Sequence, residues 1–342
     1  SFINKMAISQ SIGINVKGII SLVPKNVEDN ESLDILTESE REALIKHTGI
    51  RFRRVNPNND IGVKDYFNAG VEKLLKKLKW DKESIDILIC VTQTPKIAIP
   101  SIACQIHGDL EFESQTMCYD INSGCSGFVY GLHTVSQLLA GINKPGARAI
   151  LCSGDISTSL IDPLDRSVRP IFSDAVSITG IEKLDDESIT GYFNLETMGK
   201  GQLAIRTQPE ANGDSFMRLN GIDVFNYSVS YVPINIQKLI ETSGKSVNDM
   251  DAFVFHQANK LISDSIAKKA GLDSAKVMSS LYEYGNTASA SIPVTLGLNW
   301  SRIERKSNWI LISGFGVGFS IASAMINFNP EICEPPEEIE LN

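Results

Sequence analysis

The sequence has little of what a metal site or a disulfide framework requires. It contains six cysteines and four histidines in 342 residues, and no two cysteines form a Cys-x-x-Cys pair or stand at the spacing of zinc ligands. Because such sparse cysteines do not make a disulfide scaffold, we expect the chain to work in a reducing, cytoplasmic compartment. Those that fall within apolar runs are predicted to be reduced core residues, namely Cys90, Cys104, Cys118 and Cys152.

The chain also lacks a basic excess and long hydrophobic runs. Its net charge of −9 disfavours nucleic acid as a partner and provides no broad basic face for an anionic membrane. An acidic protein partner would therefore have to meet a local basic patch. The longest apolar stretches have the length of a strand and contain polar residues, so we expect neither a transmembrane segment nor a signal peptide.

Short buried runs recur in two similar series and predict an α/β fold. They lie at residues 86–91, 148–154, 251–256 and 308–313, and have the character of parallel strands covered on both faces. The repeated element order predicts two duplicated halves, at 1–175 and 176–328. Residues 329–342 contain many glutamates and are predicted to form an acidic surface tail.

One cysteine stands where a predicted strand gives way to a helix. Residues 116–121 alternate polar and apolar side chains, and residues 128–139 have helical spacing. Cys125 lies between them, at a helix N-terminus, where free backbone N–H groups and the helix dipole favour a thiolate. Gly124 and Gly127 permit a sharp turn beside it. The pattern predicts a nucleophile, although a small buried cysteine would leave the same pattern.

Three further stretches are candidates to meet this cysteine. His256 is the histidine that ends a predicted buried strand, and a satisfied core histidine fits that place as well. Gly285 and Asn286 precede a predicted helix, in a pattern more often found in a plain turn. Residues 313–319 are rich in glycine but lack the lysine of a phosphate loop. Their bared backbone either donates an N–H group to an oxyanion or forms a simple hairpin.

Together these stretches resemble the β-ketoacyl-acyl carrier protein synthase III family, condensing enzymes of the thiolase superfamily. The resemblance runs from about residue 10 to Phe328. It rests on motifs in a fixed order, namely Thr48-Gly49-Ile50-Arg51, Pro100-Ser101-x-Ala103-Cys104-Gln105-Ile106, Cys125-Ser126-Gly127-Phe128, Asp165-Arg166, His256-Gln257-Ala258-Asn259, Gly285-Asn286-Thr287 and Gly314-Phe315-Gly316-x-Gly318-Phe319.

The resemblance implies a thiolase-like, five-layered αβαβα fold of two duplicated halves. It implies a homodimer paired through strands near residues 114–121. It also implies a decarboxylative Claisen condensation of an acyl thioester with malonyl carrier protein, in fatty acid or specialised acyl-chain biosynthesis. No metal or redox cofactor is implied. The alternatives are an acyltransferase on the same fold, which moves an acyl group to an alcohol or amine, and an inactive partner subunit.

In this resemblance three side chains carry the chemistry. Cys125 would take the acyl group, with its pKa lowered by the helix terminus and a nearby imidazole. The backbone N–H groups of Cys125 and Val317 would form the oxyanion hole. His256 Nε2 and the Asn286 amide would donate hydrogen bonds to the malonyl thioester oxygen as carbon dioxide leaves.

Substrate-binding positions are also implied by the resemblance. Arg166 would lie at the mouth of a pantetheine channel lined by Leu219, Phe225 and Ser228. Ile99 would cross a dimer interface and shape the partner's acyl pocket, and its small size suggests extra room for the starter acyl chain.

Lys260, Lys268 and Lys269 would face the acidic carrier protein. Where family members often hold the adenine of coenzyme A, this chain has Ala43 and His47. The starter therefore arrives either on coenzyme A or on a carrier protein.

Overall fold

The computed structural model of the chain describes residues 8–211 and 213–341. The first seven residues of the predicted N-terminal half, one residue of the C-terminal half and the last residue of the predicted tail lie outside these ranges. Two six-stranded sheets form the centre of the described chain. Within it, no helix combines the length and the apolar composition that a membrane span requires.

The elements have the following bounds. The first sheet contains, in spatial order, β16 (Glu337–Ile339), β2 (Ile14–Pro24), β8 (Ala175–Lys183), β7 (Arg148–Asp155), β5 (Ile85–Val91) and β6 (Met117–Ile121). The second contains β1 (Ile8–Ile12), β9 (Ile189–Thr197), β15 (Ser320–Asn327), β14 (Trp309–Gly316), β12 (Ala252–Phe255) and β13 (Val277–Met278). Two small sheets pair β3 (Val27–Asp29) with β4 (Phe52–Arg54) and β10 (Ile205–Pro209) with β11 (Ser215–Leu219). The α-helices are α1 (Glu38–Thr48), α2 (Val63–Leu78), α3 (Ile102–Asp109), α4 (Gly127–Gly141), α5 (Gly221–Ser243), α6 (Lys260–Ala270), α7 (Leu281–Tyr284) and α8 (Ser291–Asn299).

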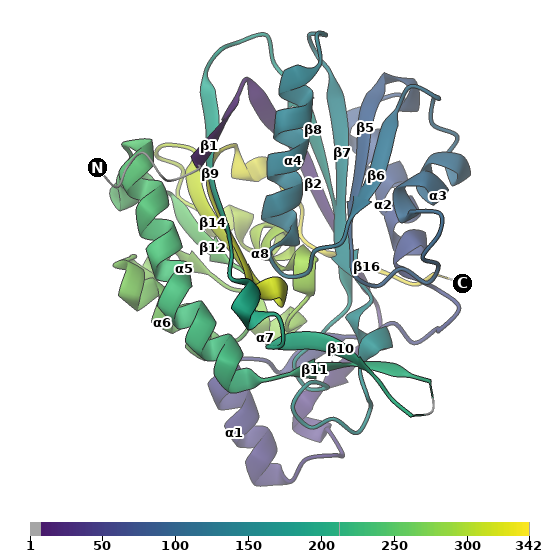
Figure 1. Cartoon of the computed structure of the whole chain (residues 1–342), viewed down its shortest axis with the longest axis vertical. Coiled ribbons are helices and arrows are strands. Elements are labelled where there is room, and N and C mark those ends of the chain that lie inside the picture. The colour runs from purple at the N-terminus through teal and green to yellow at the C-terminus, as the bar shows by residue number, and fades with distance from the viewer. Residues whose placement is uncertain (1–7, 212, 342) are drawn as a thin grey trace.

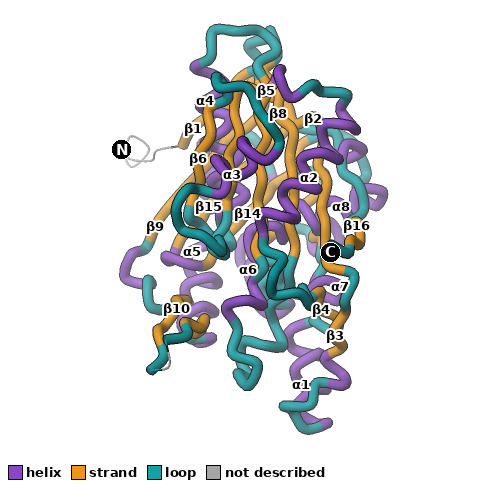
Figure 2. The backbone as a smooth tube through the Cα atoms, turned by 90° about the vertical axis from the view of Figure 1, so that its right-hand side faces the viewer, coloured by secondary structure: helices purple, strands orange, loops and turns teal. Residues whose placement is uncertain are grey.

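The two sheets and their helices stack in five layers, which confirms the predicted αβαβα arrangement. In Figure 1, α5 and α6 cover the outer face of the second sheet, and α4 and α8 lie between the sheets. The outer face of the first sheet is covered by α2 and α3, which stand in front of its strands in Figure 2. Apolar side chains of both sheets and of α4 and α8 form one core between them.

Parallel pairing brings the ends of several strands to one edge of the molecule. In the first sheet β5 pairs in parallel with β6 and with β7, and in the second β12 pairs in parallel with β13 and β14. Cys125 follows β6 and His256 follows β12. Because loops at the carboxyl ends of parallel strands are where α/β folds form their sites, the topology brings these two stretches together.

The two halves exchange strands. β1, at the start of the chain, pairs antiparallel with β9 in the second sheet, whereas β8 belongs to the first sheet. The predicted division at residue 175 therefore places β1 in the N-terminal half, although it belongs to the second sheet. It also places nearly all of β8 in the C-terminal half, although β8 belongs to the first sheet.

The predicted acidic surface tail is instead built into the first sheet. β16 pairs in parallel with β2, and the side chain of Cys333 is 2% exposed within the core between the sheets. The glutamates remain at the surface, where Glu337 pairs with Lys73 at 2.7 Å. The composition of the tail correctly predicted that its glutamates are exposed. It did not predict that the backbone between them pairs with β2.

The edge strand β6 is less buried than its alternating sequence predicts. Its side chains of Met117 and Tyr119 are 41% and 36% exposed. Of the four cysteines predicted in the core, Cys104 is exposed and Cys118 half-buried. For Cys118 the reason is that β6 is the last strand of its sheet, and no described strand of the same chain covers its outer edge, whereas Cys104 lies on α3.

Candidate active site

Cys125 lies at a corner that glycine makes possible. The chain leaves β6 at Ile121, turns, and enters α4 at Gly127. A Cβ at Gly127 would lie 2.5 Å from Val91 Cγ1, so only glycine lets this end of the helix approach β5 so closely.

The end of β14 meets the cysteine from the other half of the chain. A Cβ at Gly316 would lie 3.1 Å from Cys125 Sγ, and Gly316 has a φ of 151° that other residues rarely adopt. This close approach brings the backbone N–H of Val317 to the sulfur. The backbone N–H of Cys125 is a second donor to the same sulfur. Two backbone donors thus converge on the cysteine.

His256 is buried and neutral. Burial lowers its pKa to about 3, and a hydrogen bond with the backbone of Ala288 offsets part of this effect. Its Nδ1 lies 2.8 Å from Ser291 Oγ, and its ring meets the ring of Phe315 edge-on at 5.5 Å. A Ser291 hydroxyl that donates to Nδ1 leaves the proton on Nε2, so that Nε2 is a hydrogen-bond donor.

The Asn286 amide is oriented by its own loop. Its backbone N–H donates to the carbonyl of Ile171 at 3.0 Å, and its Oδ1 accepts from the N–H of Ala288 at 3.0 Å. The acceptor half of the amide is therefore used, and the NH₂ group is left as a donor. Gly285 permits the turn before it, with a φ of +57°.

Two cavities meet at Cys125. One, of about 250 Å³, is lined by Cys125, His256 and Asn286, and is called here the His256 cavity. The other, of about 330 Å³, is lined by Cys125, Gln93 and Asn122, and is called here the Gln93 cavity. The structure thus brings the three predicted catalytic side chains to one cavity. Among the described residues, no cluster of three or more His, Cys, Asp or Glu side chains has the arrangement of a metal site.

The prediction of a lowered thiol pKa at Cys125 is wrong for the chain without substrate. Burial, and after it the charge of Asp155, raise the pKa of Cys125 to about 12. The backbone N–H groups of Cys125 and Val317 offset only part of this. His256 is neutral and adds no positive charge, so burial outweighs the helix terminus.

Asp155, which the sequence reasoning missed, connects the two halves behind the cysteine. It is buried at the end of β7 and accepts hydrogen bonds from Thr92 Oγ1 (3.0 Å), the N–H of Gln93 (2.6 Å) and Ser289 Oγ (2.9 Å). Burial raises its pKa to about 6, so it is ionised at neutral pH. The available signal was an acid directly after the buried run at residues 148–154.

These pKa values predict how Cys125 reacts with iodoacetamide. Well below a pKa of about 12 the thiolate fraction grows tenfold per pH unit, so the alkylation rate should rise without a plateau from about pH 7 to about pH 9. Asp155→Asn removes a charge that raises this pKa and should speed alkylation above about pH 6, where Asp155 is ionised. Peptide mass spectrometry measures both rates.

The matched control is Asp174→Asn. Asp174 is also buried with a pKa raised to about 6, but it bonds to Asn56 and Thr158 rather than facing the cysteine. A plateau below about pH 9 would mean a low thiol pKa and would contradict this account.

The predicted channel residues lie in different surroundings. Leu219 lines the His256 cavity. Phe225 is half-buried against the outer core of the second sheet, and Ser228 is fully buried, with no hydrogen-bond partner for its hydroxyl among the described residues. Arg166 is largely exposed and pairs with Glu40. Ile99 is 86% exposed.

The predicted carrier-facing lysines all lie on α6. Lys260 and Lys268 line a groove of about 890 Å³ between α6 and α7. Lys260 pairs with Asp264, whereas Lys269 Nζ donates to the carbonyl of Val229 at 3.2 Å.

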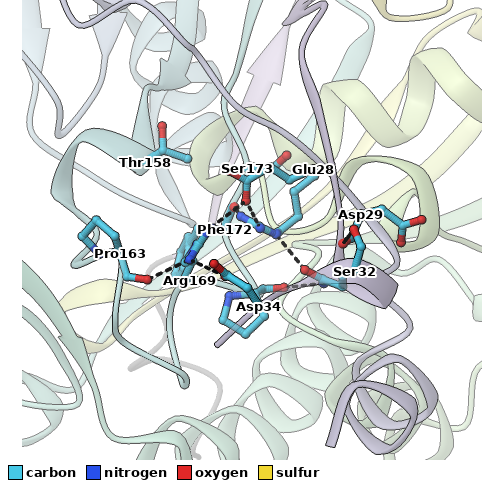
Figure 3. A network of polar contacts seen from close by, with 12 residues as sticks. Glu28, Asp29, Ser32, Asp34, Thr158, Pro163, Arg169, Phe172 and Ser173 are labelled. Carbon is cyan, nitrogen blue, oxygen red and sulfur yellow. Dashed lines mark hydrogen bonds and ion pairs between the residues drawn. The ribbon is translucent and has the colours of Figure 1, made fainter. Parts of the chain in front are cut away.

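A polar network holds the wall that both cavities share. Phe172 lines both of them, and its carbonyl accepts from the buried Arg53 at 3.5 Å. Arg169 donates to the carbonyl of Pro163 at 3.0 Å and to Asp34 at 3.4 Å, and lies between them in Figure 3. These bonds fix the segment that carries Phe172.

Comparison with known proteins gives consistent matches. The family model of 3-oxoacyl-[acyl-carrier-protein (ACP)] synthase III matches residues 119–199, and the model of its C-terminal part matches residues 240–328. The first range contains Cys125, and the second contains His256 and Asn286.

Individual relatives match over nearly the whole chain. The beta-ketoacyl-[acyl-carrier-protein] synthase III of Prochlorococcus marinus (strain MIT 9215) is 29% identical, over 93% of this chain and 97% of its own. The Clostridium acetobutylicum protein of the same name is 28% identical, over 92% and 98%. A 3-oxoacyl-(acyl-carrier protein) synthase structure from Burkholderia xenovorans LB400 is 30% identical, covers 98% of this chain and 100% of that one, and superposes with a TM-score of 0.90.

Proposed function

The chain belongs to the 3-oxoacyl-[acyl-carrier-protein] synthase III family of condensing enzymes, and we propose that it joins an acyl thioester to malonyl carrier protein with loss of carbon dioxide, in fatty acid biosynthesis. One observation carries this proposal. Cys125 shares one cavity with two hydrogen-bond donors, His256 and Asn286, and opens into a second cavity without them. A nucleophile between two cavities suits a reaction in which two acyl groups meet.

The first step is acyl transfer to Cys125. Its sulfur attacks the carbonyl carbon of the starter thioester, the new C–S bond forms, and the old one breaks. The thiol proton leaves with the departing thiol of coenzyme A or of a carrier protein. The N–H groups of Cys125 and Val317 stabilise the oxyanion of the tetrahedral intermediate.

The second step is decarboxylation in the His256 cavity. The bond between the malonyl α-carbon and its carboxylate breaks, carbon dioxide leaves, and the electron pair becomes an enolate. His256 Nε2 and the Asn286 NH₂ group donate to the enolate oxygen. Neutral donors stabilise a charge that exists only as the bond breaks, so they accelerate the step.

The third step forms the carbon–carbon bond. The enolate carbon attacks the acyl carbon on Cys125, the C–S bond breaks, and the sulfur takes a proton from solvent. A β-ketoacyl thioester leaves on the carrier protein. Atoms and charge balance with one proton consumed, and no metal or redox cofactor takes part.

Transfer of the acyl group to an alcohol or amine is less well supported. That reaction needs a base to take the acceptor's proton, and His256, with a pKa of about 3, is a poor base at neutral pH. The same burial makes its neutral N–H group a suitable donor to an enolate.

Product analysis tests the proposal. The protein is mixed with malonyl carrier protein and a panel of acyl thioesters, with an alcohol and an amine present as competing acceptors. We expect a carrier-bound product that is two carbons longer than the starter, with one carbon dioxide released per product. An ester or amide formed without carbon dioxide would overturn the proposal in favour of the acyltransferase.

We propose that Lys268 and its neighbours on α6 dock the acidic carrier protein. Reversing the charge with Lys268→Glu should raise the KM for malonyl carrier protein by about tenfold, at the scale of one lost charge pair at an interface, and leave kcat within about twofold. Steady-state kinetics at low ionic strength measure this. The control is Lys306→Glu. Lys306 lies just before the first residue of β14, whereas Cys125 lies near the last residue of that strand. Equal effects of the two variants would contradict this docking site.

We also propose a homodimer that pairs two copies of β6. Its uncovered edge and the exposed side chains of Met117, Tyr119 and Ile99 support this. Sedimentation equilibrium should give twice the chain mass, and Tyr119→Arg should shift the population toward monomer. The control is Tyr231→Arg, an exposed residue of α5. A wild-type monomer at micromolar concentration would contradict the proposal.

A further inference from the structure

The Gln93 cavity is the space left for the starter acyl group. Because the malonyl thioester must lie beside His256 and Asn286, the acyl chain on Cys125 has to extend into the other cavity that the cysteine lines. Its volume of about 330 Å³ limits the starter to roughly ten atoms the size of a water molecule, at about 30 Å³ each, so a long acyl chain does not fit. This reasoning rests on the proposed function.

The lining of this cavity combines apolar side chains, such as Ile205 and Met217, with several polar ones. Binding pockets for apolar groups are lined mostly by apolar side chains. Here the side chains that line the cavity include Gln93, Asn122, Ser157, Gln202 and Thr207.

Several of these polar groups have unused hydrogen-bonding capacity. Gln93 Nε2 donates to Asn122 Oδ1 at 3.0 Å. In the described part of the chain, Gln93 Oε1 and Asn122 Nδ2 have no further protein partner; Asn122 is exposed and Gln93 half-buried. The hydroxyl of Ser157, whose side chain is 1% exposed, has no protein partner among the described residues either. An acceptor, a donor and a hydroxyl thus line one small cavity unpaired.

The unpaired amide oxygen lies close to the nucleophile. A Cβ at Gly124, the residue before Cys125, would lie 2.5 Å from Gln93 Oε1. A starter group that pairs with Gln93 is therefore near the thioester carbon rather than at the far end of a long chain.

The charges of the cavity disfavour an anionic starter. The ionised Asp155 lines the same cavity. The cation that lines it, Arg206, already donates through its two terminal nitrogens to the carbonyl of Leu203 at 2.9 Å and to Gln208 Oε1 at 3.1 Å. A carboxylate would meet the charge of Asp155, which the solvent-exposed Arg206 offsets only in part.

We propose that the preferred starter is a short acyl group that carries an uncharged hydrogen-bonding group, such as a hydroxyl, close to its thioester, and that Gln93, Asn122 and Ser157 recognise it. A hydroxyl both donates to Gln93 Oε1 and accepts from Asn122 Nδ2 or Ser157. A plain alkyl chain leaves Gln93 Oε1 and the buried Ser157 hydroxyl without partners once water is displaced from the cavity, which costs roughly a factor of ten or more in rate.

Three thioesters of equal chain length test the proposal. The rate of Cys125 acylation is measured by intact mass for 3-hydroxybutyryl-, butyryl- and succinyl-coenzyme A, and for the same groups on carrier protein. We expect 3-hydroxybutyryl to react about tenfold or more faster than butyryl, and succinyl to be slowest. A preference for butyryl or for succinyl would overturn the proposal.

Two variants locate the preference in the cavity. Gln93→Leu, and separately the milder Ser157→Ala, should reduce the ratio of hydroxybutyryl to butyryl rates by about tenfold, mainly by slowing hydroxybutyryl. Gln237→Leu, at an exposed position on α5, is the control and should leave the ratio unchanged. An unchanged ratio in both cavity variants would also overturn the proposal.

The proposed function fails in a different way. If no thioester acylates Cys125, or if the acyl-enzyme does not condense with malonyl carrier protein, condensation itself is wrong. If condensation occurs with butyryl as the preferred starter, only the inference about starter polarity is wrong.

Discussion

Replacement of Cys125 with alanine should abolish the acyl-enzyme and lower condensation by about 10⁴-fold or more. Cys125 lines both cavities, and two backbone N–H groups converge on its sulfur. No remaining group can form the covalent intermediate, so the two acyl groups would have to react without it. Intact mass after mixing with acyl thioesters, together with the rate of product formation, measures both effects.

The matched control for this loss is Cys104→Ala. Cys104 is the exposed cysteine of α3 and lines neither cavity. Its variant should acylate and condense at the rate of the unmodified chain. Acylation that persists in Cys125→Ala, or that disappears in Cys104→Ala, would place the nucleophile elsewhere.

Loss of either donor in the His256 cavity should slow decarboxylation selectively. His256→Ala and Asn286→Ala should each lower the rate of carbon dioxide release by about 10²- to 10³-fold, the cost of one missing oxyanion donor. Acylation of Cys125 should change only a few-fold, because its oxyanion meets the backbone N–H groups instead. Single-turnover acylation and release of labelled carbon dioxide separate the two steps.

Asn286→Asp distinguishes a lost donor from a collapsed loop. Aspartate keeps an oxygen for the N–H of Ala288, which holds the loop, but removes the NH₂ group. If the donor matters, this variant is as slow as Asn286→Ala. A near-normal rate would show that Asn286 acts through the loop alone and would contradict its proposed contact with the enolate.

The sequence allowed the fold to be predicted where local pattern and long-range packing agree. The runs at residues 86–91 and 308–313 became β5 and β14 because a strand covered on both faces must be apolar throughout. The corner at Cys125 was predictable because strand alternation, glycines and helical spacing all change within a few residues.

What could not be predicted depends on neighbours distant in sequence. The pKa of Cys125 is set by burial and by Asp155, whose position beside the cysteine arises only when β7 and β6 join the same sheet around β5. Helix-end position alone therefore gave the wrong direction of the shift. Strand periodicity likewise cannot specify which strands pair. It did not predict that β1 pairs with β9, that β8 pairs with β2, or that β16 joins the first sheet.

The central claim is that Cys125 carries an acyl group which malonyl carrier protein removes by condensation. A single-turnover experiment tests it directly. The protein is acylated with a thioester, separated from excess donor, and mixed with malonyl carrier protein while intact mass and carbon dioxide are followed. We predict that the adduct on Cys125 disappears as one carbon dioxide per adduct is released, and that the acyl group is recovered in the β-ketoacyl product. An adduct that persists, or that is lost without carbon dioxide, would contradict the account.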